Sequence, residues 1–248
     1  MPSPTPLEKK PNPTPTWTRW VWGIYLTLLV FGLGVLFLTA AGGLGEMPSF
    51  EDLENPKSNL ATEIIASDGQ VIGKFYLQNR SYTKFHEISP HVIHALLATE
   101  DVRFYKHSGI DLRALVRAVV FMGREGGAST ITQQLALNLF NGQRARSKPA
   151  RILQKVKEWI IAVQLEKRYT KQEILAMYLN TVEFGYNAFG ISAASRTYFD
   201  KDVHALDVHE ASLLVGLLKG ITFYSPVRHP DRCINRRNTV IGQMVKYR

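Results

Sequence analysis

Cysteine is nearly missing from this chain, since Cys233 is the only one among 248 residues. A lone thiol excludes a disulfide framework and a metal site built from several cysteines, and we expect it to be a small, partly buried side chain. None of the seven histidines has the helical spacing with an intervening Glu that a zincin-type site uses. Gly185 and Gly190 have the end spacing of a phosphate-binding loop, but Ile191-Ser192 follows where Lys-Ser or Lys-Thr is needed. The sequence therefore contains no motif for an organic cofactor and no recognisable metal centre.

Charged side chains are absent from Trp20 to Gly45, although the formal net charge of the chain is +9. About 20 apolar residues cross a bilayer and the apolar core of a signal peptide is shorter, so we predict a transmembrane anchor over 20–42. Ala40-Ala41-Gly42 weakly resembles a cleavage site, which leaves removal of the segment open. Basic residues precede the span and acidic residues follow it, which predicts a cytoplasmic N-terminus and an extracytoplasmic remainder. The positive charge then points to a membrane surface or a phosphate-bearing substrate rather than to nucleic acid.

Composition divides the chain further. The first 19 residues are rich in Pro, Thr and Ser, a composition that does not need to fold, and Pro48 and Pro56 mark a linker after the anchor. The remainder is long enough for one ordinary hydrophobic core. We therefore expect a disordered cytoplasmic tail, a transmembrane anchor, a linker and one globular domain, over residues 1–19, 20–42, 43–58 and 59–248.

The globular part is expected to be mainly α-helical, with a small β-hairpin at its start. In ATEIIASDGQVIGKFY, two β-prone runs flank Asp68-Gly69, a strong hairpin signal. After Ser89 the apolar residues recur at helical spacing, and Thr170 with Glu173 forms a capping box that marks one helix start. The predicted helices are about 90–104, 110–123, 129–140, 149–168, 171–180, 188–198 and 207–219.

The segment HALLATEDVRFYKHSG places a carboxylate where packing is expected. Ile93, Leu96 and Leu97 set the buried stripe of the first predicted helix, and Glu100 falls on the same stripe. Partial burial is one way in which proteins produce a carboxyl group that acts as a general acid or base near neutral pH. The alternative is an ordinary surface acid in a helix whose register is misplaced.

Two other polar groups stand out. The stretch ASTITQQ, residues 128–134, places more hydroxyl and amide groups at a predicted helix start than capping requires, and helix starts attract anions. Glu158 lies beside the apolar stripe of the helix predicted over 149–168. It is either an i,i+3 partner of Lys155 on the surface or a second functional acid.

Together these stretches resemble the peptidoglycan glycosyltransferases of family 51, found as monofunctional membrane-anchored enzymes and at the N-terminal side of class A penicillin-binding proteins. The resemblance covers about 85–248, roughly two-thirds of the chain, in five ordered blocks. The blocks read ATEDVRFYKHSGID, GASTITQQLALNLF, QKVKEWIIAVQLEKRYTKQEILAMYLN, FGYNAFGISAASRTYFDK, and LDVHEASLLVGLLKGITFYSPVRHP with RRNTVIGQM. This resemblance implies a lysozyme-like helical domain with a membrane-associated jaw lobe at the cell inner (cytoplasmic) membrane. It also implies lipid II and the growing lipid-linked glycan as substrates.

The resemblance implies roles for individual residues. Glu100 would be the general base that deprotonates the 4-hydroxyl of the acceptor sugar in lipid II. That oxygen would displace undecaprenyl pyrophosphate from the donor's anomeric carbon with inversion, giving a β-1,4 link. Glu158 would be the second acid, acting at the pyrophosphate directly or through a divalent cation, Mg²⁺ or Mn²⁺. The implied substrate-binding and supporting residues are Asp101, Phe104, His107, Ser129, Thr130, Gln134, Lys155 and Lys201.

Two positions depart from the family's pattern. Leu137 stands where the second block usually has Lys, and Gln154 stands where the third block usually has Arg. Both lost cations would be expected to face the leaving pyrophosphate, whose negative charge must be stabilised. We expect a rearranged pyrophosphate clamp drawn from the neighbouring cations Arg144, Arg146, Lys148 and Arg151.

The apolar run 119–122, with Arg113, Arg117 and Arg124 nearby, is either core or a part of the jaw that contacts anionic lipid. Any peptide cross-linking is expected to come from a transpeptidase or other cell-wall synthesis proteins. Two other functions stay open at this point. The chain could be a lytic enzyme that cleaves glycan with paired carboxylates, or a non-catalytic scaffold that holds lipid II or cell-wall partners.

Overall fold

The computed structural model describes residues 16–43, 62–65, 71–75, 82–121, 127–140 and 145–247, and the chain divides into two units, Met1–Met47 and Pro48–Arg248. The first unit contains α1 (Thr16–Ala40). Its most apolar 18-residue window has a mean hydropathy of 2.3, and the 24 residues from Trp17 to Ala40 span about 36 Å at a rise of 1.5 Å per residue. By length and composition this helix can cross a membrane, as predicted. Most of the predicted tail and linker lies outside the described residues.

The second unit begins with the predicted hairpin. Strand β1 (Thr62–Ile65) pairs antiparallel with β2 (Val71–Phe75), with Thr62 opposite Phe75 and an irregularity between Ile64 and Ile65. The Asp68-Gly69 turn itself lies outside the described residues.

The rest of the second unit is mainly helical in the residues that the structure describes, and all seven predicted helices are present with shifted ends. Ser89 begins the first of them as predicted: its hydroxyl accepts the His91 N–H at 3.3 Å and donates to Leu206 O at 2.8 Å. The capping box of Thr170 and Glu173 is confirmed. The helices are α3 (Pro90–Glu100), α4 (Leu112–Val120), α5 (Ile131–Phe140), α6 (Lys148–Arg168), α7 (Lys171–Thr181), α8 (Ile191–Phe199) and α9 (Val208–Leu217). The described part of the chain also contains three short 3-10 helices, η1 (Phe85–Glu87), η2 (Phe104–Lys106) and η3 (Val203–Ala205).

Two differences from the predicted helices have physical causes. The first helix was predicted to run to residue 104, but it ends at Glu100 because Asp101 leaves helical geometry, at φ −155° and ψ 74°. A further helix, α10 (Pro230–Lys246), was not predicted. Its buried residues are Cys233 and Val240, and Arg236 and Arg237 interrupt the apolar spacing between them. Cys233 is buried as a small core residue, and this burial raises the pKa of its thiol.

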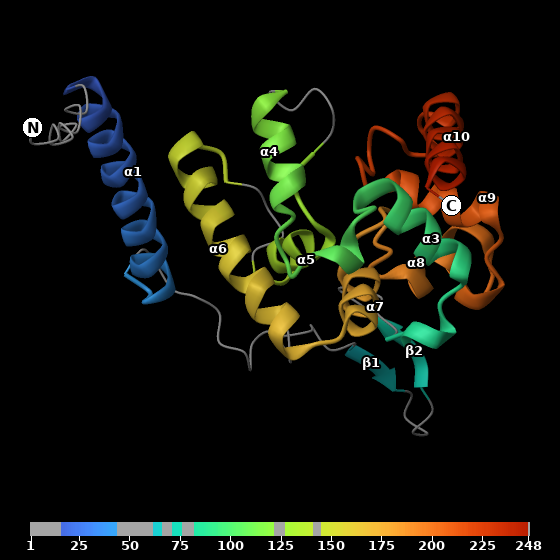
Figure 1. Ribbon diagram of the computed structural model, residues 1–248. Coiled ribbons are helices and arrows are strands. Elements are labelled where there is room, and N and C mark those ends of the chain that lie inside the picture. Colours follow the sequence, from blue (N-terminus) through green and yellow to red (C-terminus); the bar gives the residue numbers. More distant parts are fainter. Residues whose placement is uncertain are drawn as a thin grey trace, which may run out of the picture. The chain divides into compact units, whose positions relative to one another are not determined.

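The helices form two packed groups (Figure 1). One group brings α3, α9 and α10 together, and in the other α5 contacts both α6 and α7. The largest fully buried side chains come from both groups, among them Leu96 of α3, Leu135 of α5, Leu165 of α6 and Tyr178 of α7.

Gly109 makes a close backbone contact with α6. Its φ is +86°, and a Cβ at this position would lie 2.9 Å from the carbonyl carbon and oxygen of Ala162. Its own carbonyl accepts hydrogen bonds from Thr130 Oγ1 at 2.7 Å and Gln133 Nε2 at 3.0 Å. Glycine is therefore required both by the backbone conformation and by the space.

We predict that Gly109→Ala lowers the free energy of unfolding by more than about 2 kcal/mol, because a strained φ and a backbone clash add together. Gly242→Ala is the matched control, since nothing lies within 4 Å of a Cβ there and the position is inside α10. The control should be neutral or gain up to about 1 kcal/mol from helix propensity. Urea unfolding monitored by circular dichroism measures both, and equal midpoints would contradict the prediction.

Candidate active site

Two adjoining cavities lie in the second unit and share the side chains of Ser129 and Gln134. The larger, about 790 Å³, is lined by Glu100, Asp101 and Thr130 among others. The smaller, about 310 Å³, is lined by Glu158 and Lys155 among others. The two acids singled out from the sequence therefore lie in neighbouring hollows with one common wall.

Glu100 is the last residue of α3, and its side chain is 19% exposed at the larger cavity. The helical register that placed it on the buried stripe is thus correct, and the side chain reaches the cavity because the helix stops there. Gln134 Nε2 of α5 donates to Glu100 Oε2 at 2.9 Å. Arg236 of α10 approaches Glu100 Oε1 to 4.0 Å with Nη2.

Asp101 connects this helix end to the start of α5. His107 Nε2 lies 3.0 Å from Asp101 Oδ2 and 3.1 Å from Oδ1, and since a carboxylate can only accept, the imidazole donates. Asp101 Oδ2 also accepts the Ile131 N–H at 3.1 Å, which satisfies a free donor at the start of α5. Phe104 is fully buried, and its ring packs edge-on against His107. Phe104 and His107 therefore support the site from behind and line neither cavity.

A buried ion pair that was not predicted from the sequence lies next to His107 and the start of α5. Glu166 at the end of α6 pairs with Lys171 at the start of α7 at 2.8 Å, and its carboxylate is only 5% exposed. Thr132 of the TITQQ stretch (residues 130–134) donates to Glu166 at 2.7 Å. Lys171 also donates to His107 O at 2.7 Å and lies 4.2 Å from the centre of the Phe104 ring. The pair thus joins three helices to the segment that carries His107.

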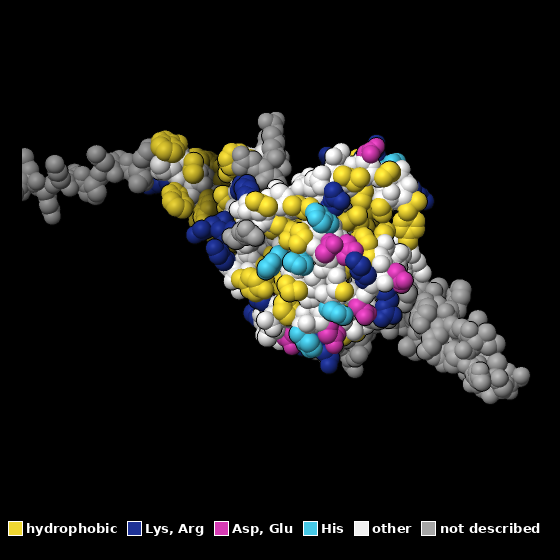
Figure 2. Space-filling view, turned by 90° about the vertical axis from the view of Figure 1, so that its right-hand side faces the viewer, with side chains coloured by type: hydrophobic (Ala, Val, Ile, Leu, Met, Phe, Trp, Pro, Cys, Tyr) yellow, Lys and Arg dark blue, Asp and Glu magenta, His cyan; other side chains and the backbone are white. Residues whose placement is uncertain are grey.

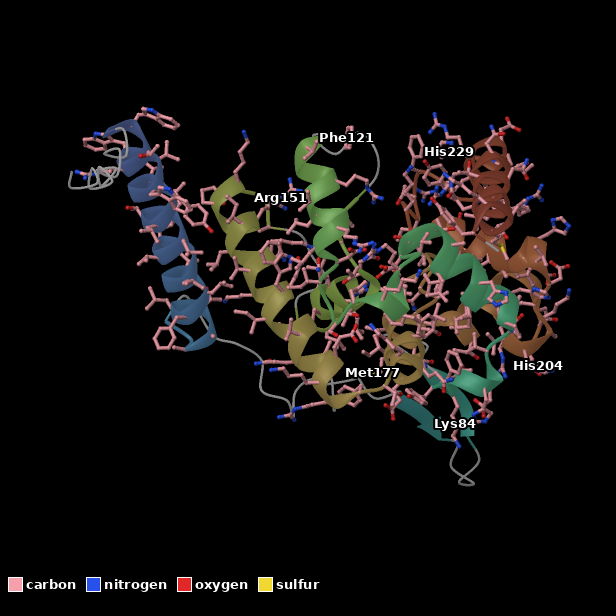
Figure 3. The ribbon with its side chains drawn as sticks, in the orientation of Figure 1. Lys84, Phe121, Arg151, Met177, His204 and His229 are labelled. Carbon is pink, nitrogen blue, oxygen red and sulfur yellow. The ribbon has the colours of Figure 1, made fainter. Side chains whose placement is uncertain are left out.

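The smaller cavity holds the second acid and its cation. Lys155 Nζ donates to Glu158 Oε2 at 2.7 Å and to Ser129 Oγ at 2.9 Å, so the predicted i,i+3 pair is present and faces a cavity. The side chain of Glu158 is 12% exposed. Arg151, one turn earlier on the same helix, also lines the cavity. Figure 3 shows Arg151 near the start of α6.

The two departures from the family pattern also line the smaller cavity. Leu137 and Ile152 contribute apolar wall. The amide oxygen of Gln154 accepts the Ala145 N–H at 2.9 Å, so this side chain fixes the segment that precedes α6. Of the four candidate clamp cations, only Arg151 lines either cavity, and Arg144 lies outside the described residues.

Among the predicted substrate-binding residues, Phe104 and His107 lie behind the cavities, whereas Lys201 lies away from the site altogether. Its ammonium donates to Glu210 at 2.6 Å at the start of α9, and this hydrogen bond raises the pKa of Lys201. It lines neither cavity. The histidines are surface residues as expected, except for the half-buried His107 and His229, and Figure 2 shows several histidines on one face.

Comparisons with known proteins show the family of the chain. The transglycosylase family model matches residues 68–245. Penicillin-binding protein 1F of Bacillus subtilis is 41% identical over 188 residues, covering 74% of this chain and 26% of that protein. Penicillin-binding protein 1A of Aquifex aeolicus is 37% identical over 228 residues, covering 90% and 30%. The chain thus spans less than a third of the length of these relatives.

A solved structure was also matched. The crystal structure of penicillin-binding protein 1A from Haemophilus influenzae aligns at a TM-score of 0.42 and 24% identity, covering 77% of this chain and 19% of that one. Family membership therefore rests on the sequence matches and not on this superposition.

We predict that Lys171→Met destabilises the domain, because it leaves the buried Glu166 carboxylate without its cation. The loss should approach the about 3–5 kcal/mol typical of a broken buried pair, reduced by the partial exposure of Lys171. The double variant Glu166→Gln/Lys171→Met should recover part of the loss, since it removes the unpaired charge and keeps an acceptor for Thr132. Lys201→Met is the control, because Lys201 is in an exposed ion pair. Its free energy of unfolding, measured in urea, should fall clearly less than that of Lys171→Met. Equal losses at the two lysines would contradict the prediction.

Proposed function

The chain belongs to the transglycosylase family, and from this premise we propose that it is a peptidoglycan glycosyltransferase that polymerises lipid II into β-1,4-linked glycan. The observation that carries the proposal is the position of Glu100: a mostly buried carboxylate, held through one oxygen, at a cavity that adjoins a second cavity with another acid. The larger cavity would receive the acceptor sugar and the smaller one the diphosphate of the donor.

The proposed reaction is a single displacement. The acceptor's 4-hydroxyl oxygen forms a bond to the anomeric carbon of the donor while Glu100 takes the hydroxyl proton. The bond from that carbon to the lipid diphosphate breaks, and the diphosphate leaves with the electron pair. A positioned general base typically contributes about 10²–10⁴ in rate. Charge that develops on the leaving group requires cations or hydrogen-bond donors already in place.

The smaller cavity supplies such groups. Lys155 is engaged with Glu158 and Ser129, so the ammonium and the hydroxyl form a fixed polar wall. Arg151 makes no ion pair with any residue in the described part of the chain, which leaves its guanidinium available for the diphosphate. We assign Arg151 as the cation that takes over from the two lost at positions 137 and 154.

A divalent cation, Mg²⁺ or Mn²⁺, fits only in part. Among the described residues no group of three or more His, Cys, Asp or Glu could hold a metal ion. Of the described residues that line the smaller cavity, Glu158 is the only acid, and Mg²⁺ often binds through one carboxylate with substrate phosphates and water. The cation would therefore neutralise diphosphate charge, with Glu158 as its single protein ligand.

The membrane arrangement is proposed on two features. α1 would anchor the chain with the N-terminus in the cytoplasm and the cavities on the outer side of the cytoplasmic membrane. On α4, Leu112, Val116 and Val120 are 69%, 62% and 65% exposed at four-residue spacing, which gives the helix an unburied apolar stripe. Arg113 and Arg117 accompany it, as expected for a helix that contacts anionic lipid, and Phe121 lies at its far end (Figure 3). A transpeptidase would be a partner for cross-linking.

We predict that Glu100→Gln lowers lipid II polymerisation by at least about 10²-fold, because the amide cannot take the proton. The control is Glu183→Gln, an exposed acid that lines neither cavity, which should retain wild-type rate. The assay follows glycan chains by gel electrophoresis with purified protein, lipid II and Mg²⁺, and the fold is checked by circular dichroism. Undiminished activity of Glu100→Gln would refute the assignment.

Two further assays on the purified wild-type protein distinguish a glycosyltransferase from a lytic enzyme and from a non-catalytic scaffold. Release of muropeptides from finished, lipid-free glycan would identify a lytic enzyme. Lipid II binding without polymer formation by the wild-type chain would identify a scaffold.

We predict that Arg151→Ala lowers kcat/KM for lipid II about 10–100-fold, the loss expected when a charge-assisted hydrogen bond of about 1.5–3 kcal/mol is removed. Arg146 and Lys148 lie near the start of the same helix and line neither cavity. Arg146→Ala and Lys148→Ala should therefore lower kcat/KM much less. Leu137→Lys in the Arg151→Ala background should restore activity, because it returns a cation to the same cavity. Full activity in Arg151→Ala and in each other clamp variant, including Arg144→Ala, would rule out the clamp.

A further inference from the structure

Tyr178 is a buried hydroxyl that the mechanism above leaves unused. It lies on α7, its side chain is 1% exposed, and it lines neither cavity. Its hydroxyl donates to Gln134 Oε1 at 2.8 Å, and the other end of that amide donates to Glu100 Oε2 at 2.9 Å. A relay of two hydrogen bonds therefore runs from the core to the carboxylate.

The chemistry of the three groups fixes which atom donates and which accepts in each of the two hydrogen bonds. An ionised carboxylate offers only acceptors, so the NH₂ end of Gln134 must face Glu100 and the oxygen must face Tyr178. Burial, and secondarily the charge of Glu100, raise the pKa of Tyr178, so its hydroxyl stays protonated and is able to donate. Donation to the amide oxygen polarises the amide and strengthens its donation to the carboxylate.

The relay also distinguishes the two oxygens of Glu100. Oε2 is occupied by Gln134, whereas no described residue donates a hydrogen bond to Oε1, whose charged neighbour is Arg236 at 4.0 Å. Oε1 is thus the oxygen available to a substrate hydroxyl. A carboxylate without the Gln134 bond could rotate and lose this preference, and small misplacements of a catalytic group are costly.

We propose that Tyr178 is a positioning residue for the general base: through Gln134 it holds Glu100 so that Oε1 accepts the proton of the acceptor hydroxyl. This inference rests on the proposed function. It assigns a catalytic consequence to a core side chain about three-quarters of the way along the chain.

Tyr178→Phe tests the proposal because it removes only the hydroxyl and keeps the buried ring. We expect kcat for lipid II polymerisation to fall about 5–30-fold, with KM within about twofold of wild type, since the cavity walls are unchanged. The matched control is Tyr198→Phe. Tyr198 donates its hydroxyl to Phe184 O at 2.8 Å, burial raises its pKa to about 12, and it lines neither cavity. This control loses a comparable hydrogen bond and should keep the wild-type kcat.

A double-mutant cycle separates positioning from stability. In a Gln134→Ala background, Tyr178→Phe should cause no further fall in kcat, because the relay is already broken. Equal kcat values for Tyr178→Phe and Tyr198→Phe, or fully additive effects of Tyr178→Phe and Gln134→Ala, would overturn the proposal. A failure of the proposed function would show differently, as undiminished activity in Glu100→Gln whatever Tyr178→Phe does.

Discussion

The Asp101 carboxylate is the contact on which the site depends, because it ends one helix and begins another. It stops α3 directly after Glu100, and it accepts the first free N–H of α5 and the imidazole N–H of His107. Hydrogen bonds to a charged acceptor are the stronger kind, and the side chain is 5% exposed, so water competes little. One carboxylate thereby fixes where Glu100 of α3 meets Gln134 of α5.

The remaining contacts hold this junction from outside. Thr130 and Gln133 bind the carbonyl of Gly109, which in turn lies against the backbone of α6. Glu166 and Lys171 join α5, α6 and α7 beneath it. The TITQQ stretch is thus rich in polar groups chiefly because these groups bind backbone and neighbouring acids, and fewer of them remain for a substrate than its composition indicates.

How much the sequence could predict depends on the range of each interaction. Helical spacing, the Ser89 start and the Thr170–Glu173 box are local, and the structure confirms them. The position of Glu100 on a buried stripe was predictable for the same reason. The early end of α3 was not, because Asp101 ends the helix through a bond to Ile131, thirty positions away. Tyr178 and Arg236 reach the site from α7 and α10, and no local pattern could reveal that.

The wall shared by the two cavities has a consequence for ligand design. Because Ser129 and Gln134 border both hollows, two fragments bound side by side would be separated only by these side chains. Joining such fragments by a short tether makes the second association intramolecular, so weak sugar-like and anionic pieces combine into one tight-binding compound. An apolar substituent that contacts Leu137 and Ile152 would bind this chain in preference to a protein that has a lysine at position 137.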